Sequence, residues 1–287
     1  MSAIVLVALL PSTIASARPS AAKLLARNAD DPAALDRLSA QLSPGEVARV
    51  LRGSDADAVR AAVAVAPRMP GGLAVLPDLM LLAARASGPG DAALAAARTM
   101  VHRAMGAAGE IEPLAGEPRD SFIVAITALA QRADLPAARR AAALELAAHF
   151  LRAGDGPERT LLASLIATLL GDRDAELRLA AAELAPDDPA LQQRLTDALA
   201  DPSEPVALAA AMQLCARVPI AILDDAAIMR VRAALTDPSR LVSQLLRLMP
   251  CVRAHGAAED AAALKALKKH RSPSVKKLAA ALAFRPR

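Results

Sequence analysis

The chain contains neither tryptophan nor tyrosine, and its only phenylalanines are Phe122, Phe150 and Phe284. β-Strands are enriched in aromatic and β-branched residues. The scarcity of aromatic side chains therefore disfavours a core built from sheets. Alanine instead supplies about a quarter of the 287 residues. Because alanine has the highest helix propensity and lets helices approach closely, the composition predicts an all-α protein with a core of Ala, Leu and Val.

Common local motifs of enzymes are missing as well. There is no G-x-S-x-G, G-x-x-x-x-G-K-[ST] or G-x-G-x-x-G sequence, so nucleophile-elbow, P-loop and dinucleotide-binding sites have no local support. The four histidines are His102, His149, His255 and His270, and none is followed by glutamate. The sequence therefore predicts no catalytic, metal-binding or cofactor-binding residue and no small-molecule substrate.

Acidic residues are absent from one end of the chain. Residues 265–287 carry eight lysines and arginines and no Asp or Glu, which is +8; the formal charge of the whole chain is +4, so the other residues sum to −4. The basic end is consistent with contact to an acidic protein, a nucleic acid or an anionic lipid, and equally with the polar outer face of a capping repeat from about residue 259. The lysines proposed for such contacts are Lys265, Lys268, Lys269, Lys276 and Lys277.

Long uncharged apolar runs are also missing. The first 17 residues, MSAIVLVALLPSTIASA, join an apolar stretch from Ala3 to Leu10 to the sequence Ala15-Ser16-Ala17. This order is typical of a secretory signal peptide with a small-residue cleavage site, and eight apolar residues are too few to span a bilayer. We expect residues 1–17 to be a signal peptide and the protein to be periplasmic or extracellular; the alternative is a first packing helix and a cytoplasmic protein.

Similar segments recur along the chain at a period near 36 residues. Each opens with Gly, Asp, Ser or Pro, continues with an apolar anchor residue and runs on as an alanine-rich helix. Asp201 and Asp237 are predicted to cap two of these helices. The anchors are Val59, Leu94, Ala138, Leu177, Val206, Val242 and Val275, with spacings of 35, 44, 39, 29, 36 and 33.

A second amphipathic segment follows each capped helix except the last, as in 73–86, 121–133, 157–170, 188–200, 224–235 and 259–269. The repeating unit is thus a helical hairpin. A hairpin of this length cannot bury its apolar stripe alone, so neighbouring hairpins are predicted to stack into a right-handed α-solenoid with one continuous core. We expect residues 18–44 to be an N-terminal capping segment and residues 45–284 to be an array of about seven hairpins.

The pattern D-x-x-x-x-V-R-x-x-A around Val59-Arg60 and Leu177-Arg178 resembles HEAT repeats of the short, phycobilisome-lyase-like type. The arginine is replaced at Ala207 and Ser243. The resemblance covers about 45–284 and implies a non-enzymatic scaffold that binds an unknown protein partner. It also implies that the second helices line the concave, partner-binding surface. The arginines on those helices, candidates for that contact, are Arg85, Arg132, Arg194, Arg230 and Arg232.

The family resemblance makes two other activities poor matches. Metal-dependent hydroxylases built from HEAT-like repeats have iron ligands that resemble His-Glu pairs, which this chain lacks. An accessory lyase or modifying subunit is a further reading, for which the sequence offers no chemistry. Residues 106–120, GAAGEIEPLAGEPRD, break the helical periodicity and are expected to form a loop insertion, either a solvated one or an acidic contact loop.

The only two cysteines are the last residues of two similar segments of the chain. ALADPSEPVALAAAMQLC (198–215) and ALTDPSRLVSQLLRLMPC (234–251) agree in seven of eighteen positions. The cysteines could form a disulfide, bind a metal with His255, or fill one core slot in consecutive repeats. Stacked helices lie about 8–10 Å apart, a disulfide needs Cα atoms within about 7 Å, and a structural zinc site needs four ligands. We therefore expect two unbonded, buried cysteines.

Overall fold

A computed structural model describes residues 19–85, 88–104, 117–152, 156–217 and 223–283. These residues form helices and no strands, which confirms the predicted all-α class. None of the helices in these ranges is long and apolar enough to cross a membrane. The segment 1–17 lies outside the described ranges, and so does most of the predicted loop 106–120; its last four residues belong to the helix that begins at Glu117.

The chain divides into two compact units, one ending at Val75 and one beginning at Leu76. The predicted first hairpin, 53–66 with 73–86, is therefore split between them. In the first unit α1 and α2 both pack against α4, and α3 packs against α4 and η2. The elements of this unit are α1 (Ala21–Arg27), α2 (Pro32–Gln41), α3 (Pro44–Leu51), α4 (Ala56–Val65), η1 (Ala66–Arg68) and η2 (Gly72–Val75).

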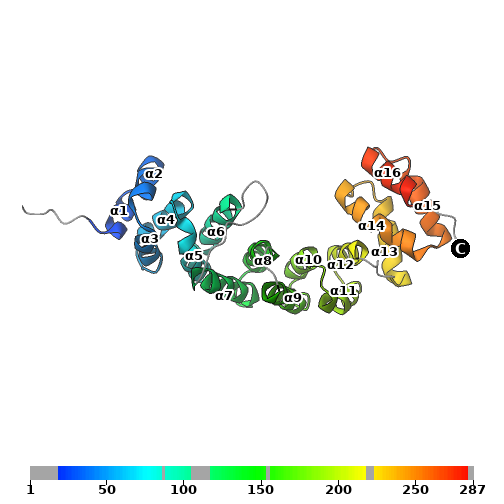
Figure 1. Ribbon diagram of the computed structural model, residues 1–287, viewed down its shortest axis with the longest axis horizontal. Helices are drawn as coiled ribbons and strands as arrows, with labels where there is room; N and C mark the ends of the chain where they lie inside the picture. The colour runs from blue at the N-terminus through cyan, green and yellow to red at the C-terminus, as the bar shows by residue number, and fades with distance from the viewer. Residues whose placement is uncertain (1–18, 86–87, 105–116, 153–155, 218–222, 284–287) are drawn as a thin grey trace, which may run out of the picture. The chain divides into compact units, whose positions relative to one another are not determined.

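The second unit is a succession of helical hairpins, as the periodicity predicts (Figure 1). Its capped helices are α6 (Gly90–Ala104), α8 (Ala137–Arg152), α10 (Ala175–Leu184), α12 (Glu204–Ala216), α14 (Val242–His255) and α16 (Pro273–Ala281). Its second helices are α5 (Leu76–Ala83), α7 (Glu117–Gln131), α9 (Pro157–Leu169), α11 (Gln192–Ala198) with η3 (Pro189–Leu191) before it, α13 (Asp225–Thr236) and α15 (Ala258–Leu267).

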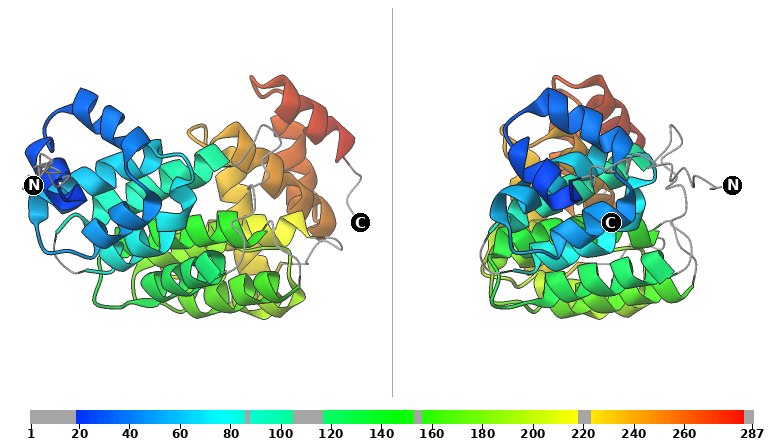
Figure 2. Two further views of the ribbon diagram at one scale, coloured as in Figure 1. Left: turned by 60° about the vertical axis from the view of Figure 1, so that its left-hand side comes forward. Right: turned by 90° about the vertical axis from the view of Figure 1, so that its left-hand side faces the viewer.

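The two rows of helices form two layers with an apolar core between them. Figures 1 and 2 show α8, α10 and α12 side by side over α7, α9 and α11. Leucine and alanine fill most of the core, and Leu129, Leu144 and Leu162 are almost fully buried. Phe122 and Phe150, the only described aromatic residues besides histidine, meet edge to face with ring centroids 5.0 Å apart.

The two rows differ in how closely their helices pack. Capped helices contact one another in unbroken succession from α6 to α16, whereas the described parts of α9 and α11, and of α11 and α13, touch little. At the start of the unit the order is reversed, since α5 contacts α7 more extensively than α6 contacts α8, so neither row is the closer packed throughout. That the second helices line the concave surface therefore stays a prediction.

Cys215 on α12 and Cys251 on α14 form a disulfide, so the expectation of two unbonded cysteines is wrong. Their Cα atoms are 5.2 Å apart. The predicted separation was the distance between helix axes, but Cα atoms lie about 2.3 Å from each axis. Where two positions face each other across axes about 8–10 Å apart, this geometry leaves roughly 3–5 Å between Cα atoms, which a disulfide can bridge.

Asp201 and Asp237 are not the helix caps that the sequence suggested. α12 and α14 begin three and five residues later, and their N-cap residues are Ser203 and Leu241. Asp201 and Asp237 instead accept hydrogen bonds from the backbone N–H groups of Ser203 and Ser239, in the turns before the helices. The carboxylate of Asp201 also accepts hydrogen bonds from Arg178 of the preceding repeat.

Candidate functional site

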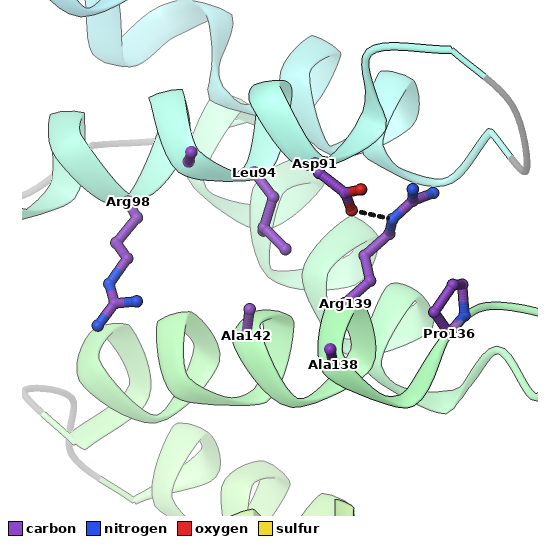
Figure 3. Close-up of a pocket in the computed structure, with 8 residues that line it drawn as sticks. Asp91, Leu94, Arg98, Pro136, Ala138, Arg139 and Ala142 are labelled. Atoms are coloured by element: carbon purple, nitrogen blue, oxygen red, sulfur yellow. Dashed lines mark hydrogen bonds and ion pairs between the residues drawn. The ribbon is translucent and has the colours of Figure 1, made fainter.

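A groove of about 300 Å³ runs between the capped helices α6 and α8 of the second unit (Figure 3). Its walls are mostly apolar: Leu94 and Ala95 come from α6, and Ala138 and Ala142 come from α8. Figure 3 shows Leu94 and Arg98 extending from α6 toward α8. The groove thus has an apolar floor of a size that suits one or two side chains of a bound peptide.

The groove exists because one anchor residue is unusually small. Ala138 is the only alanine among the seven anchors, and it is exposed, whereas the anchors Leu94, Leu177 and Val206 are buried. A leucine or valine at 138 would fill the space between the two helices. The small anchor is visible in the sequence, so it is the signal that could have predicted this groove.

Asp91 and Arg139 form an ion pair at one end of the groove. Arg139 Nε donates to Asp91 Oδ1 at 2.6 Å, and its Nη1 donates to the carbonyl oxygen of Arg85 at 2.9 Å. Arg139 is buried, whereas the Asp91 side chain is 80% exposed. The hydrogen bond from Arg139 and its charge lower the pKa of Asp91 against the opposing effect of burial. Asp91 is therefore ionised at neutral pH.

Gly90 makes room for the buried guanidinium of Arg139. A Cβ atom at position 90 would lie 2.8 Å from Arg139 Nη1 and 3.2 Å from the carbonyl oxygen of Ala83. Both distances are shorter than ordinary contacts of a Cβ atom. Glycine therefore allows Arg139 to reach across from α8 to the carbonyl groups at the end of α5.

Arg98 and Glu145 form a looser ion pair toward the other end of the groove. Arg98 Nη2 lies 3.4 Å from a Glu145 carboxylate oxygen, and the two side chains are 55% and 41% exposed. Farther along the same two helices, the ring centroids of His102 and His149 lie 5.6 Å apart. Because the Arg98 guanidinium is exposed and weakly held, it is free to turn toward the carboxylate of a bound partner.

Buried or half-buried arginines on α8 and α10 join consecutive repeats. Arg140 Nη2 lies 2.6 Å from Asp172 Oδ2, and Arg178 binds both carboxylate oxygens of Asp201, at 2.7 and 3.0 Å. We call the pairs Arg139–Asp91, Arg140–Asp172 and Arg178–Asp201 the Arg–Asp ladder. It holds α6, α8, α10 and the turn before α12 in register, which fixes the width of the groove. The sequence shows the Arg139-Arg140 dipeptide but not the opposite directions in which the two side chains point.

The ladder keeps its carboxylates ionised. Burial acts to raise the pKa of Asp172, but hydrogen bonds from Arg140 and from the Asp174 backbone outweigh it, so the pKa is lowered. The hydrogen bonds from Arg178 lower the pKa of Asp201, again against burial. These charged pairs have structural partners already, so they position the repeats rather than react.

The structure does not bring the predicted partner-binding arginines of the second helices together as a free surface. Arg230 donates to the carbonyl oxygen of Leu199, and Arg232 Nε donates to Asp260 Oδ1 at 2.7 Å. Arg132 is likewise held, by Asp134 and the carbonyl oxygen of Ala84. Arg194 is exposed on α11, without a hydrogen bond or ion pair to a described residue. Two of the three arginines proposed as site residues, Arg230 and Arg232, thus have partners within the chain.

Arg232 belongs to a cluster that joins α13, α14 and α15. Asp260 is fully buried; it accepts from Arg232 and from the backbone N–H of Ala257, and its Oδ2 lies 2.6 Å from His255 Nδ1. Burial acts to raise the pKa of Asp260, but hydrogen bonds from Arg232 and His255 outweigh it and lower the pKa. His255 is therefore engaged with Asp260, not with Cys251.

The proposed lysines of the basic end are all exposed. Lys265 lies on α15, Lys268 and Lys269 follow it, and Lys276 and Lys277 lie on α16. Among the described residues no three or more His, Cys, Asp or Glu side chains are grouped so that they could hold a metal ion.

No protein-family model matches the chain, and no curated protein matches it. Solved structures of helical-repeat proteins are similar in part. YibA of Escherichia coli is 15% identical, covering 88% of this chain and 96% of its own, with a TM-score of 0.43. A designed armadillo repeat protein is 16% identical, covering 84% and 98%, with a TM-score of 0.41. Human deoxyhypusine hydroxylase is 16% identical, covering 92% and 84%, with a TM-score of 0.22. These values are low, and the assignment to helical-repeat proteins rests on the order and packing of this chain's own helices.

Proposed function

We propose that this protein is a non-enzymatic, HEAT-like scaffold that binds an extended segment of a protein partner on the capped helices of its second unit. The groove between α6 and α8 carries the proposal. An apolar side chain of the partner would fit against Leu94, Ala138 and Ala142, and a neighbouring carboxylate would pair with Arg98. This mode uses the capped helices α6 and α8, whereas the family resemblance implies binding by the second helices.

The chemistry of the groove supports binding rather than catalysis. Its lining side chains are apolar or already paired, and the ionised Asp91 is held by Arg139. A general acid or base needs a pKa near the working pH, whereas the pKa of Asp91 is shifted away from neutrality. None of the lining residues is a Ser, Cys, Thr or Lys nucleophile.

We further propose that the protein works in an oxidising compartment after export. The signal-like sequence at residues 1–17 is one support. The disulfide between Cys215 and Cys251 is the other, because such bonds persist in secreted and periplasmic proteins and are rare in the cytosol. Sequencing the N-terminus of the protein from its native host would test this: a chain starting at Arg18 is expected, and an intact Met1 in a cytosolic fraction contradicts export.

A groove-filling variant tests the scaffold proposal. Ala138→Leu places at this anchor the side chain that other repeats carry, and Ala128→Leu on α7 adds the same side chain to an exposed position elsewhere. Affinity capture from a native extract is expected to recover one partner with the wild-type chain and with Ala128→Leu but not with Ala138→Leu. A partner retained equally by all three proteins rules out the groove as its binding site.

A further inference from the structure

Six cations surround the turn between α15 and α16. They are exposed, and no described carboxylate lies within ion-pair distance of any of them. This contrasts with the arginines earlier in the second unit, most of which are held by aspartates or backbone carbonyl groups. The six residues, which we call the basic turn, are Lys265, Lys268, Lys269, Arg271, Lys276 and Lys277.

Nearby acids do not neutralise the basic turn. Asp260 is fully buried and its carboxylate is taken by Arg232, His255 and the backbone of Ala257. Glu259 is exposed at the opposite end of α15, about two turns of helix from Lys265. The net field at the turn is therefore positive, and it attracts anions.

The backbone of the turn is ordered, so the cations are displayed on a fixed frame. Lys269 N donates to the carbonyl oxygen of Ala266, and His270 N donates to that of Leu267, both at 3.0 Å. His270 Nδ1 accepts from the backbone N–H of Ser272 at 3.0 Å, which leads the chain into α16. A partner that binds here needs to order only the lysine side chains, not the backbone.

The side chains around the basic turn indicate how a partner would bind. The exposed large apolar residues among the described ranges are Leu81, Val124, Leu161, Met229 and Leu241, and none lies on α15 or α16. Insertion into a lipid bilayer is therefore not expected. Five of the six cations are lysines, which act as point charges without the bidentate geometry of arginine. The surface suits a dense array of phosphate groups and not one particular anion.

We infer that the basic turn binds the phosphate headgroups of an anionic membrane surface, peripherally and without insertion. The disulfide favours this source of phosphate over nucleic acid, because it points to an oxidising compartment, where lipid headgroups are abundant and nucleic acid is not. The inference is independent of the proposed groove between α6 and α8, which lies on other helices. It would tether the scaffold to a membrane while the groove holds a partner.

Vesicle binding by the full chain tests the inference. Each lysine close to an anionic surface increases binding about five-fold. The wild-type protein is expected to sediment with phosphatidylglycerol-containing phosphatidylcholine vesicles at about 0.05 M salt and to be released at about 0.5 M, where screening is strong. It is not expected to bind vesicles of phosphatidylcholine alone. Failure to bind the anionic vesicles at low salt overturns the inference.

A charge-matched pair of variants separates this surface from net charge. In the test variant Lys265, Lys268, Lys269, Lys276 and Lys277 are all changed to Gln, and binding is expected to fall at least about 100-fold. In the control, the same charge is removed at exposed cations elsewhere: Lys23, Arg27, Arg37, Arg49 and Arg194, each changed to Gln. The control is expected to bind like the wild type. Equal losses in both variants would show that net charge alone is responsible.

Two further measurements keep the result interpretable. The far-ultraviolet circular dichroism and unfolding midpoint of both variants are expected to match the wild type, because all ten side chains are exposed. Short duplex DNA is titrated under the same conditions. Tight DNA binding without vesicle binding would assign the basic turn to nucleic acid and overturn the membrane proposal.

Discussion

Arg178 binds both carboxylate oxygens of Asp201 across the junction between α10 and α12, and it is the last member of the Arg–Asp ladder. At the two following repeats the corresponding positions hold Ala207 and Ser243, which cannot form such a pair. The disulfide of Cys215 and Cys251 joins α12 to α14 at this point. A covalent link thus replaces the missing ion pair where the ladder stops.

Removing the disulfide should destabilise the repeats after α12. The bond closes a segment with a sequence separation of 36. The chain-entropy model gives a loss of about 3–4 kcal/mol in the free energy of unfolding when a loop of this size is opened. We expect that loss when Cys215 and Cys251 are both changed to Ala, measured by urea unfolding under oxidising conditions. Thiol reductants should weaken the wild type and leave the double variant unchanged; a wild-type protein indifferent to reductant would contradict this role.

Acid should weaken the Arg–Asp ladder. The pKa of Asp201 is lower in the folded protein than in the unfolded chain, so the unfolded chain binds the proton more tightly. The stability from this group is present above the unfolded pKa of about 3.9 and is lost as the pH falls toward the folded pKa. Asp172 and Asp260 shift in the same direction. The free energy of unfolding should therefore be nearly flat from about pH 7 to 5 and fall below about pH 4.

Asp201→Asn assigns part of that acid sensitivity to one residue. Breaking a buried ion pair by removing one charge costs about 3 kcal/mol, and we expect a loss near this size at pH 7. The difference between variant and wild type should shrink as the pH falls below the unfolded pKa of about 3.9 and toward the lowered folded pKa of Asp201. Asp237→Asn is the control, since Asp237 is more exposed and its partner Arg240 also binds Glu204. A loss below about 1 kcal/mol is expected there, and parallel pH curves for wild type and Asp201→Asn would argue against the assignment.

Gly90→Ala should destabilise the protein although alanine favours helices. The new Cβ atom would lie 2.8 Å from Arg139 Nη1, and displacing this buried group should cost about 1–2 kcal/mol. The same substitution in an Arg139→Met background should lose most of this cost, because the obstructing guanidinium is absent. Urea unfolding of the four proteins forms a double-mutant cycle. An identical cost in both backgrounds would place the obstruction at the Ala83 carbonyl instead.

Local features of the fold were predictable from the sequence because they depend on nearby residues. The apolar spacing and the Gly, Asp, Ser and Pro openings predicted the capped and second helices, and the structure confirms them. The disulfide was not predictable in this way, since it depends on which faces of α12 and α14 meet. The same limit applies to Asp201, whose carboxylate serves Arg178 in the preceding repeat instead of capping its own helix.

The candidate site was only partly visible in the sequence for the same physical reason. The small anchor Ala138 signals a gap in the core pattern, but the groove also depends on the spacing of α6 and α8, which the ion pair of Asp91 and Arg139 fixes. The arginines of the second helices looked alike as sequence, because each follows apolar residues at helical spacing. Their roles differ because the residues opposite them differ: Arg232 faces buried Asp260, whereas Arg194 faces solvent.

A pair of arginine variants tests that distinction. Arg232→Ala leaves the fully buried carboxylate of Asp260 without its main cation, so we expect a loss of about 3 kcal/mol in the free energy of unfolding. Arg194→Ala removes an exposed side chain and should change it by less than about 0.5 kcal/mol. Urea unfolding of both variants measures the difference. If Arg232→Ala unfolded at the wild-type midpoint, the ion pair of Arg232 with Asp260 would not stabilise the fold.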